Sequence, residues 1–217
     1  RVSVVGTERE CSMLTGRNGL LAVVLTVLVG CGVNWATSYE PIPSEVSQNW
    51  ALGGVNVDVP LTLSAGEANV FAPSSDIVWQ EELLEPGEIR HTQVDEIMTE
   101  AITRGASGLN GSRPVDLNVE VTRFHALSDY ARVRLVDEGV HDITFLMEVV
   151  DSRTGEVLVP ESEMRTDLIA FAGQESIDAL AQGITQRVRI TDHVAASIAG
   201  FLGTGPDNRG TFRRFGR

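Results

Sequence analysis

Apolar and polar residues alternate most regularly over residues 115–122, where every second residue is Val or Leu. A period of two is typical of a β-strand with one buried face. The same alternation runs through 143–150, but there the second face is also partly apolar, which predicts a central strand. Shorter runs predict further strands at 55–59, at 77–79, around Val133 and Leu135, and at 157–159 and 164–171.

Two segments follow a period of three and four instead. Between Gly87 and Arg104 the apolar residues fall on one helical face, and Gly105 is expected to end that helix. The pattern returns over 177–202 for about seven turns, which predicts one long helix that crosses the sheet.

These elements together predict an α/β (α+β) fold. The expected architecture is a two-layer sandwich, a mostly antiparallel sheet with two helices packed on one face. We assign residues 54–203 to this single domain and expect 204–217 to be a disordered tail. Residues 31–53 are predicted to be a tether, because Pro41-Ile42-Pro43 favours an extended path. Its aromatic residues (Trp35, Tyr39, Trp50) are expected to pack on the edge of the domain or at a bilayer interface, or to form a partner-binding strip.

The N-terminal segment has a different composition from the rest of the chain. Arg17 precedes an apolar run of ten residues, 20–29. A membrane-spanning helix needs about 20 apolar residues, so this run is too short to cross a bilayer comfortably. A positive charge followed by a short apolar run and a small residue is typical of an export signal. Residues 1–30 are therefore predicted to be a signal peptide. Residues 1–12, which precede Met13, are interpreted as an extension absent from the native product.

The end of the apolar run, Leu28-Val29-Gly30-Cys31, resembles the lipobox of bacterial lipoproteins. The resemblance implies lipid transfer to the Cys31 thiol, cleavage between Gly30 and Cys31, and a covalent membrane anchor. Gly32 follows in place of the Asp that commonly retains such proteins in the inner membrane. The implied location is the cell envelope, at the outer membrane facing the periplasm. An ordinary signal peptide and a buried core helix are the alternatives.

Charge restricts the partners of the domain. The chain has 30 acidic and 17 basic residues and a net charge of −13. Such a chain repels phosphate backbones, so we expect no nucleic-acid partner. All the basic residues are Arg, so we expect no lysine chemistry. Of the two cysteines, Cys11 precedes Met13, and a start at Met13 leaves Cys31 alone, so we expect no disulfide and no metal–thiolate site. We likewise expect no other metal site and no cofactor.

Candidate chemistry is sparse. The chain contains neither a nucleophile elbow nor a phosphate loop nor a dinucleotide fingerprint. The four histidines (His91, His125, His141, His193) are scattered, and each is expected to be solvated or hydrogen-bonded. His141 and Asp142 are adjacent in a predicted strand and would point to opposite faces. We therefore expect no enzyme.

Two short segments suggest a partner-binding patch instead. Arg189, Asp192 and His193 lie on the polar side of the predicted last helix. Phe124 and His125 break the strand alternation, as a bulge that redirects side chains would. The alternative is a solvated face with salt bridges.

The order of lipobox, aromatic segment, strands, Asp-Ser-Arg-Thr-Gly-Glu hairpin at 151–156 and last helix resembles a family of small uncharacterised envelope lipoproteins of Gram-negative bacteria. The resemblance covers about residues 31–202 and rests also on the segments 123–127, 140–143 and 189–193. It implies a membrane-anchored, non-enzymatic interaction or accessory module with an envelope protein partner. The alternative functions are a carrier of lipid or another apolar ligand, and a hydrolase with a site assembled from distant segments.

Overall fold

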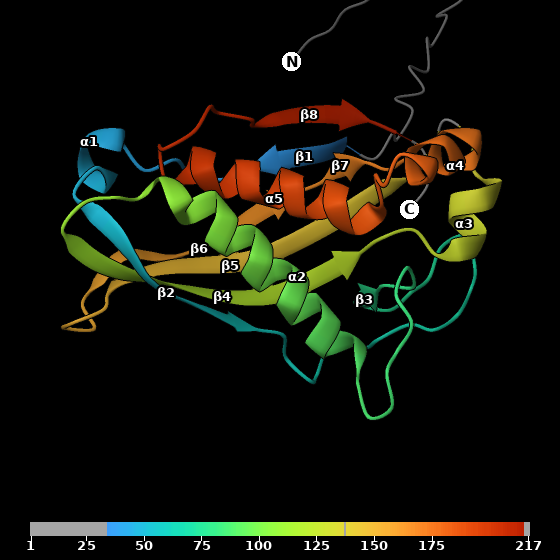
Figure 1. Ribbon diagram of the computed structural model, residues 1–217, viewed down its shortest axis with the longest axis horizontal. Helices are drawn as coiled ribbons and strands as arrows, with labels where there is room; N and C mark the ends of the chain where they lie inside the picture. Colours follow the sequence, from blue (N-terminus) through green and yellow to red (C-terminus); the bar gives the residue numbers. More distant parts are fainter. Residues whose placement is uncertain (1–33, 137, 215–217) are drawn as a thin grey trace, which may run out of the picture. The chain divides into compact units, whose positions relative to one another are not determined.

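The computed structural model describes residues 34–136 and 138–214. They belong to one compact unit that contains a mixed sheet and helices packed against it (Figure 1). The strands are β1 (Asn34–Ser38), β2 (Trp50–Asp58), β3 (Ile77–Val78), β4 (Arg113–His125), β5 (Val140–Asp151), β6 (Val157–Thr166), β7 (Leu168–Ile169) and β8 (Gly210–Arg213). The helices are α1 (Ser44–Ser47), α2 (Arg90–Gly105), α3 (Asp129–Arg134), α4 (Gly173–Ala181) and α5 (Gln186–Phe201), with a 3₁₀ turn at Ala106–Gly108. In this part of the chain no helix is long and apolar enough to cross a membrane.

The sheet has the order β2-β4-β5-β6-β1-β8, with β3 beside β4 and β7 beside β5. Strands β2 and β3 run parallel to β4, and the other pairs are antiparallel. The chain reaches β4 from β2 through α2, as a parallel neighbour requires a crossover connection. The predicted fold class, a mostly antiparallel sheet with helices packed against it, is confirmed.

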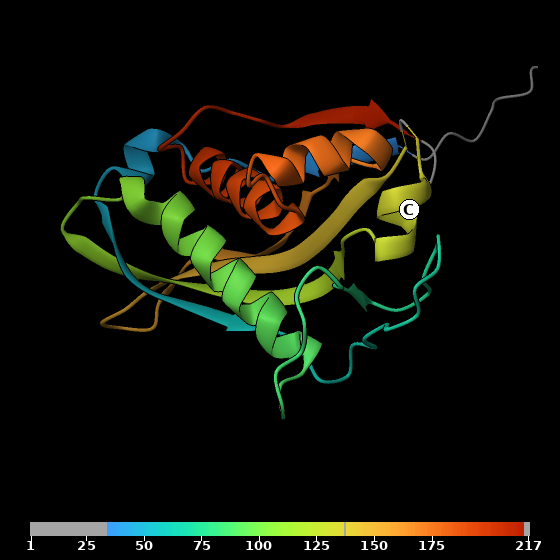
Figure 2. The same cartoon turned by 45° about the vertical axis from the view of Figure 1, so that its right-hand side comes forward.

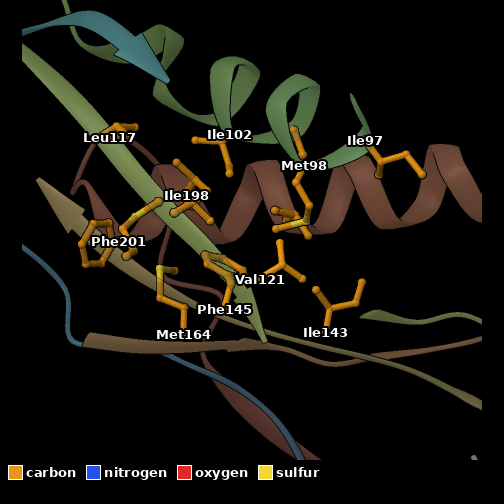
Figure 3. Close-up of a cluster of buried hydrophobic side chains, with 14 of the residues drawn as sticks. Ile97, Met98, Ile102, Leu117, Val121, Ile143, Phe145, Met164, Ile198 and Phe201 are labelled. Carbon is orange, nitrogen blue, oxygen red and sulfur yellow. The ribbon is translucent and has the colours of Figure 1, made fainter. Parts of the chain in front are cut away.

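Helices α2 and α5 lie on the same face of the sheet, and the core fills the space between the layers (Figures 2 and 3). The alternation predicted for 115–122 is the reason, since its apolar positions face the helices while Asn118 and Glu120 face away. Figure 3 shows Met98 of α2 and Ile198 of α5 above Phe145 of β5, and all three side chains are fully buried.

The two helices approach closely at the end of α2. A Cβ atom at position 105 would lie 2.5 Å from the carbonyl oxygen of Ala195 and 2.6 Å from the Cβ of Ile198. Gly105 therefore allows a backbone contact that a larger residue would prevent.

The predicted tether is wrong for residues 34–53. Asn34–Ser38 forms β1 between β6 and β8, and β2 already begins at Trp50. Trp35 is only 2% exposed, so the aromatic residues of this segment belong to the fold. Pro41 and Pro43 make the segment look like a linker, but the pairing partners of β1 are more than 120 residues away in the sequence.

The predicted tail is wrong for residues 210–213. This segment is β8, an edge strand that pairs with β1 from Asn34 to Thr37. Asp207 and Asn208, which precede it, are hydrogen-bonded to the buried Tyr39. The extended segment gains its order from a neighbour at the other end of the chain.

Two further predictions need correction. The long last helix is two helices, since Gly183 adopts a left-handed backbone conformation (φ +76°) between α4 and α5. The strand expected around Val133 and Leu135 is instead the end of α3, which Ser128 caps by accepting a hydrogen bond from the Ala131 N–H.

Candidate ligand-binding recess

A small recess lies where α3, α4 and the start of α5 meet the first residues of β5. Its volume is about 20 Å³, close to the space that one water molecule needs. Polar side chains from four elements line it together with Phe171, Ala179, Leu180 and Ile184: Glu81, Arg132, His141, Ser176, Thr185, Gln186 and Arg189.

His141 forms the floor of the recess. It is the second residue of β5 and pairs with Leu168 of β7. The side chain is completely buried, and neither ring nitrogen has a hydrogen-bond partner among the described residues. Burial, together with the charges of Arg189 and His193, lowers the pKa of His141 to about 3. The imidazole is therefore neutral at pH 7 and offers one N–H donor and one acceptor.

Arg189 forms one wall. Its guanidinium carbon lies 3.4 Å from the centre of the Phe171 ring, and its Nη2 donates to the Ile169 carbonyl oxygen at 2.6 Å. Its Nη1 is buried without a partner in the described part of the chain, where Arg189 forms no ion pair. Burial and nearby Arg214 lower the pKa of Arg189, although Glu175 opposes them. A guanidinium of this kind still carries its charge at neutral pH.

Arg132 contributes a third donor from α3. Its Nη2 is bonded to Asp129, whereas its Nε is buried and has no partner within the described ranges. His141, Arg132 and Arg189, each of which has an unpaired side-chain nitrogen, thus line one recess.

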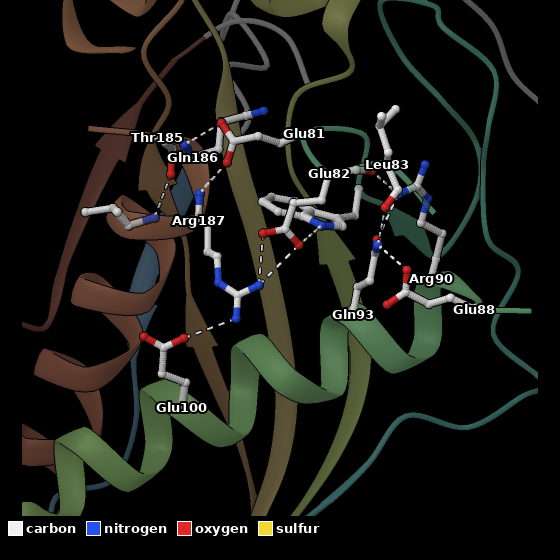
Figure 4. Close-up of polar contacts among 12 residues, drawn as sticks. Glu81, Glu82, Leu83, Glu88, Arg90, Gln93, Glu100, Thr185, Gln186 and Arg187 are labelled. Atoms are coloured by element: carbon white, nitrogen blue, oxygen red, sulfur yellow. Dashed lines mark hydrogen bonds and ion pairs between the residues drawn. The ribbon is translucent and has the colours of Figure 1, made fainter. Parts of the chain in front are cut away.

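The other polar groups of the recess are already engaged. Glu81 accepts hydrogen bonds from the backbone N–H groups of Gln186 and Arg187, each at 2.8 Å, at the N-terminus of α5 (Figure 4). The negative charge of Glu81 therefore stabilises the positive, N-terminal end of the α5 dipole. Thr185 caps the same helix through the Val188 N–H, and Ser176 donates to the Gly173 carbonyl oxygen.

The loop that carries Glu81 is held to α5 by an ion pair and to α2 by a hydrogen bond. Arg187 of α5 bridges Glu82 and Glu100, at 2.9 and 3.1 Å, as Figure 4 shows. Arg90, which is buried at the start of α2, donates to the Glu82 carbonyl oxygen at 2.6 Å. The wall of the recess is thus held to α2 as well as to α5.

The residues predicted for a partner patch do not form one surface. Arg189 lines the recess, while Asp192 is exposed and paired with Arg104 at 2.6 Å. His193 was expected to face away from the core, but it is partly buried, with its Nε2 2.9 Å from Thr37 Oγ1. At this point α5 therefore packs against β1, a strand of the same sheet.

Phe124 and His125 lie in the interior, which corrects their assignment to the patch. Phe124 is fully buried against Trp79, and His125 is held by the Ser75 carbonyl oxygen. The register of β4 does shift between Val121 and Arg123, as the predicted bulge requires. Gly30 and Cys31, the predicted cleavage and lipidation residues, lie outside the described residues.

Sequence reasoning missed His141 as a candidate. A signal was present, because His141 has the same parity as Ile143 and Phe145 and so continues the buried face of β5. What the pattern could not show was that its ring would have no partner. Over the described ranges, no group of three or more His, Cys, Asp or Glu is arranged to hold a metal ion.

Comparison with known families gives one assignment. A model described as a family of unknown function, DUF6778, matches residues 50–217. The chain belongs to the DUF6778 family. A search of curated proteins gave no match.

Solved structures give weaker likenesses. A provisionally assigned lipoprotein from Caulobacter crescentus is 12% identical with a TM-score of 0.30, over 52% of this chain and 85% of that one. A PelC dodecamer from Paraburkholderia phytofirmans is 10% identical with a TM-score of 0.31, over 80% of this chain and 98% of that one. An uncharacterised protein is 19% identical with a TM-score of 0.31, over 75% and 98%. Scores this low carry no functional argument for this DUF6778 protein.

Proposed function

We propose that this chain is an envelope lipoprotein, anchored by lipid on Cys31, whose domain binds a partner at the membrane without catalysing a reaction. The lipobox Leu28-Val29-Gly30-Cys31 supports the anchor. The observation that carries the proposal is the position of β1, which begins at Asn34, three residues after Cys31. Three residues reach at most about 11 Å. A lipid on Cys31 would therefore hold the folded domain directly at the bilayer, without a flexible tether.

The end of the domain where β1 begins carries exposed apolar side chains that could contact the bilayer. Helices α3 and α4 lie at this end (Figure 1), and Ala170, just before α4, accepts a hydrogen bond from Arg214, which follows β8. Ile177 and Leu180 of α4 are each about half exposed, at 50% and 49%. Apolar side chains exposed beside an anchor favour contact with the lipid interface.

The anchor is tested by metabolic labelling with a radioactive fatty acid, comparing the native chain with Cys31→Ser. We expect label on the native chain alone, and recovery of the native chain in the membrane fraction. Equal absence of label from both chains would contradict the anchor and would indicate an ordinary exported domain.

The orientation at the membrane has a separate test. In a Cys31→Ser background, the double substitution Ile177→Ser and Leu180→Ser should reduce sedimentation with phosphatidylethanolamine–phosphatidylglycerol vesicles severalfold. Val157→Ser is the matched control, since Val157 is also 49% exposed but lies on the β5–β6 hairpin, at the opposite end of the sheet. Equal sedimentation of all three chains would show that α4 does not face lipid.

Partner binding is tested by pull-down from detergent-solubilised membranes. We expect the same envelope protein to be recovered repeatedly with the native chain. Repeated failure to recover any protein would argue against an interaction module, even if the anchor were established.

A further inference from the structure

We infer that the recess between α3, α4 and α5 binds an oxyanion, either the carboxylate or the phosphate end of a small molecule or of a lipid headgroup. This inference goes beyond the proposed function and does not depend on the anchor. It rests on the unpaired donors of His141, Arg189 and Arg132, which face one recess in an otherwise acidic protein.

Four of the six buried side-chain atoms without a hydrogen-bond partner in the described residues belong to side chains of this recess, and the other two are Asp167 Oδ1 and Thr191 Oγ1. Polar groups buried in folded proteins nearly always have partners, and each one without a partner requires an explanation. Here a fully buried imidazole with two unpaired nitrogens lines the same recess as unpaired nitrogens of Arg189 and Arg132. Because three side chains from three elements share the same deficiency, a common ligand explains them together.

The charge of the ligand follows from the arginines. Burying a cation without a counter-charge is costly, and Arg189 forms no ion pair within the described residues. Glu81, the one carboxylate of the recess wall, is bonded to two backbone N–H groups of α5. A water molecule would satisfy the ring nitrogens of His141 but would supply no counter-charge to Arg189, and the nearby Glu175, which raises the pKa of Arg189, forms no ion pair with it.

The size and lining of the recess restrict the group that enters. Its volume of about 20 Å³ admits one oxygen atom of an end group, with the remainder of the ligand outside. Oxygen atoms of a carboxylate or a phosphate accept charge-assisted hydrogen bonds from guanidinium N–H groups, which are the donors present. Leu180 and Ile184 line the recess and are partly exposed, so they can contact an apolar portion attached to the anion.

The test uses the full-length chain purified in detergent. Its melting temperature is measured in increasing sodium acetate and sodium phosphate, with sodium chloride at the same ionic strength as reference. We expect acetate or phosphate to raise the melting temperature in a saturable way, because a ligand that binds only the folded state stabilises it. Arg189→Gln should raise the half-saturating concentration by about tenfold or more. Arg209→Gln is the matched control, since Arg209 is paired with Asp207 at the surface.

A second measurement covers the case in which Arg189→Gln does not fold. The ring ¹⁵N resonances of His141, assigned by comparison with His141→Gln, should shift during the same titrations of the native chain. The inference is overturned if these resonances stay constant and the melting temperature matches that in chloride. It is equally overturned if a folded Arg189→Gln chain responds as the native chain does, which would leave a water molecule as the occupant.

The source of the anion is separated by one further comparison. Vesicles with and without phosphatidylglycerol are added to the Cys31→Ser chain and to its Arg189→Gln derivative. A preference for phosphatidylglycerol that Arg189→Gln abolishes assigns the site to a lipid headgroup, whereas saturation by soluble acetate or phosphate alone assigns it to a free small molecule. Fatty-acid labelling of Cys31 is unaffected by Arg189→Gln, so failure of this inference is distinguishable from failure of the anchor.

Discussion

The guanidinium of Arg189 stacks on the ring of Phe171, with 3.4 Å between the guanidinium carbon and the ring centre. Phe171 follows β7, and Arg189 belongs to the first turn of α5, so this contact joins the loop after the sheet to the helix that covers it. Arg189 also lines the recess that contains His141, and its Nη1 is buried there without a partner among the described residues. The same contact thus holds the loop after β7 against α5 and positions the Arg189 guanidinium beside the recess.

We predict an energetic coupling between these two side chains. A double-mutant cycle of Phe171→Leu and Arg189→Gln, followed by urea unfolding, should give a coupling of about 0.5–2 kcal/mol. Arg134 and Tyr130 provide a control pair, because they are 5.6 Å apart at the surface and should couple more weakly. Equal coupling in both pairs would mean that burial does not strengthen the Arg189 stacking.

The close approach of α2 and α5 gives a second prediction. Gly105→Ala should lower the free energy of unfolding by about 1–3 kcal/mol, because the added Cβ meets the backbone of Ala195 and cannot be relieved by a side-chain rotation. Gly210→Ala is the matched control, since nothing lies within 4 Å of a Cβ there. Similar effects of the two substitutions would contradict the observed helix contact.

The correction of the tether gives a third prediction. Trp35→Ala should destabilise the domain by about 3–5 kcal/mol, as loss of a buried Trp does. Ser38→Ala, at an exposed position of the same strand, should change the stability by less than about 0.5 kcal/mol. A domain that tolerated Trp35→Ala would indicate that β1 contributes little to the fold.

Asp167 should make the domain less stable as the pH rises. Its side chain is buried, Oδ2 accepts from the Ala36 N–H and from Arg165, and Oδ1 has no partner in the described part of the chain. Burial raises the pKa of Asp167 to about 6 from 3.8, and nearby Asp142 adds to the effect.

The direction of this pH dependence of stability follows from the number of protons that Asp167 binds in the folded and unfolded states. Between pH 3.8 and about 6 the folded state binds more protons at Asp167 than the unfolded state, so the stabilisation is complete below pH 3.8 and is lost as the pH rises through 6. The two pKa values differ by about two pH units, which corresponds to about 3 kcal/mol. In Asp167→Asn this contribution should vanish from the difference between unfolding curves at pH 4, 5, 6 and 7. An unchanged pH profile would refute the assignment.

His141 should act in the opposite direction. Its pKa of about 3 in the folded state lies below the ordinary value of 6.5, so the unfolded state binds more protons between these values. The stability is present above pH 6.5 and is lost as the pH falls toward 3, by roughly 1.4 kcal/mol per pH unit. Facing His141 are Arg189 and His193 of α5, Arg132 of α3 and the Glu81 carboxylate.

Replacement of His141 by Gln should therefore flatten the acid side of the stability profile. Urea unfolding of both chains at pH 4–7 measures this difference in stability. Acetate, if it binds in the recess, should weaken the acid loss in the native chain and leave His141→Gln unaffected. A native profile as flat as that of His141→Gln would mean that the ring accepts a proton in the folded state.

The elements whose pattern is local could be predicted from the amino-acid sequence alone. The alternation at 115–122 and 143–150 and the helical period before Gly105 correspond to β4, β5 and α2, because a residue's face in a strand or helix follows from its spacing alone. From these elements followed the fold class. The lipidation of Cys31 stays a prediction from the sequence.

Elements that depend on pairing between distant segments became visible in the folded protein alone. Strands β1 and β8 carry weak local signals and gain order from each other across about 175 residues, so the segments containing them were predicted to be a tether and a tail. The recess likewise depends on contacts between segments that are distant in the sequence. The three side chains with unpaired nitrogen atoms come from α3, β5 and α5, and the sequence places His141 on a buried face without showing which groups surround it. Whether a buried polar group has a partner depends on the packing of separate elements, and no local pattern contains that information.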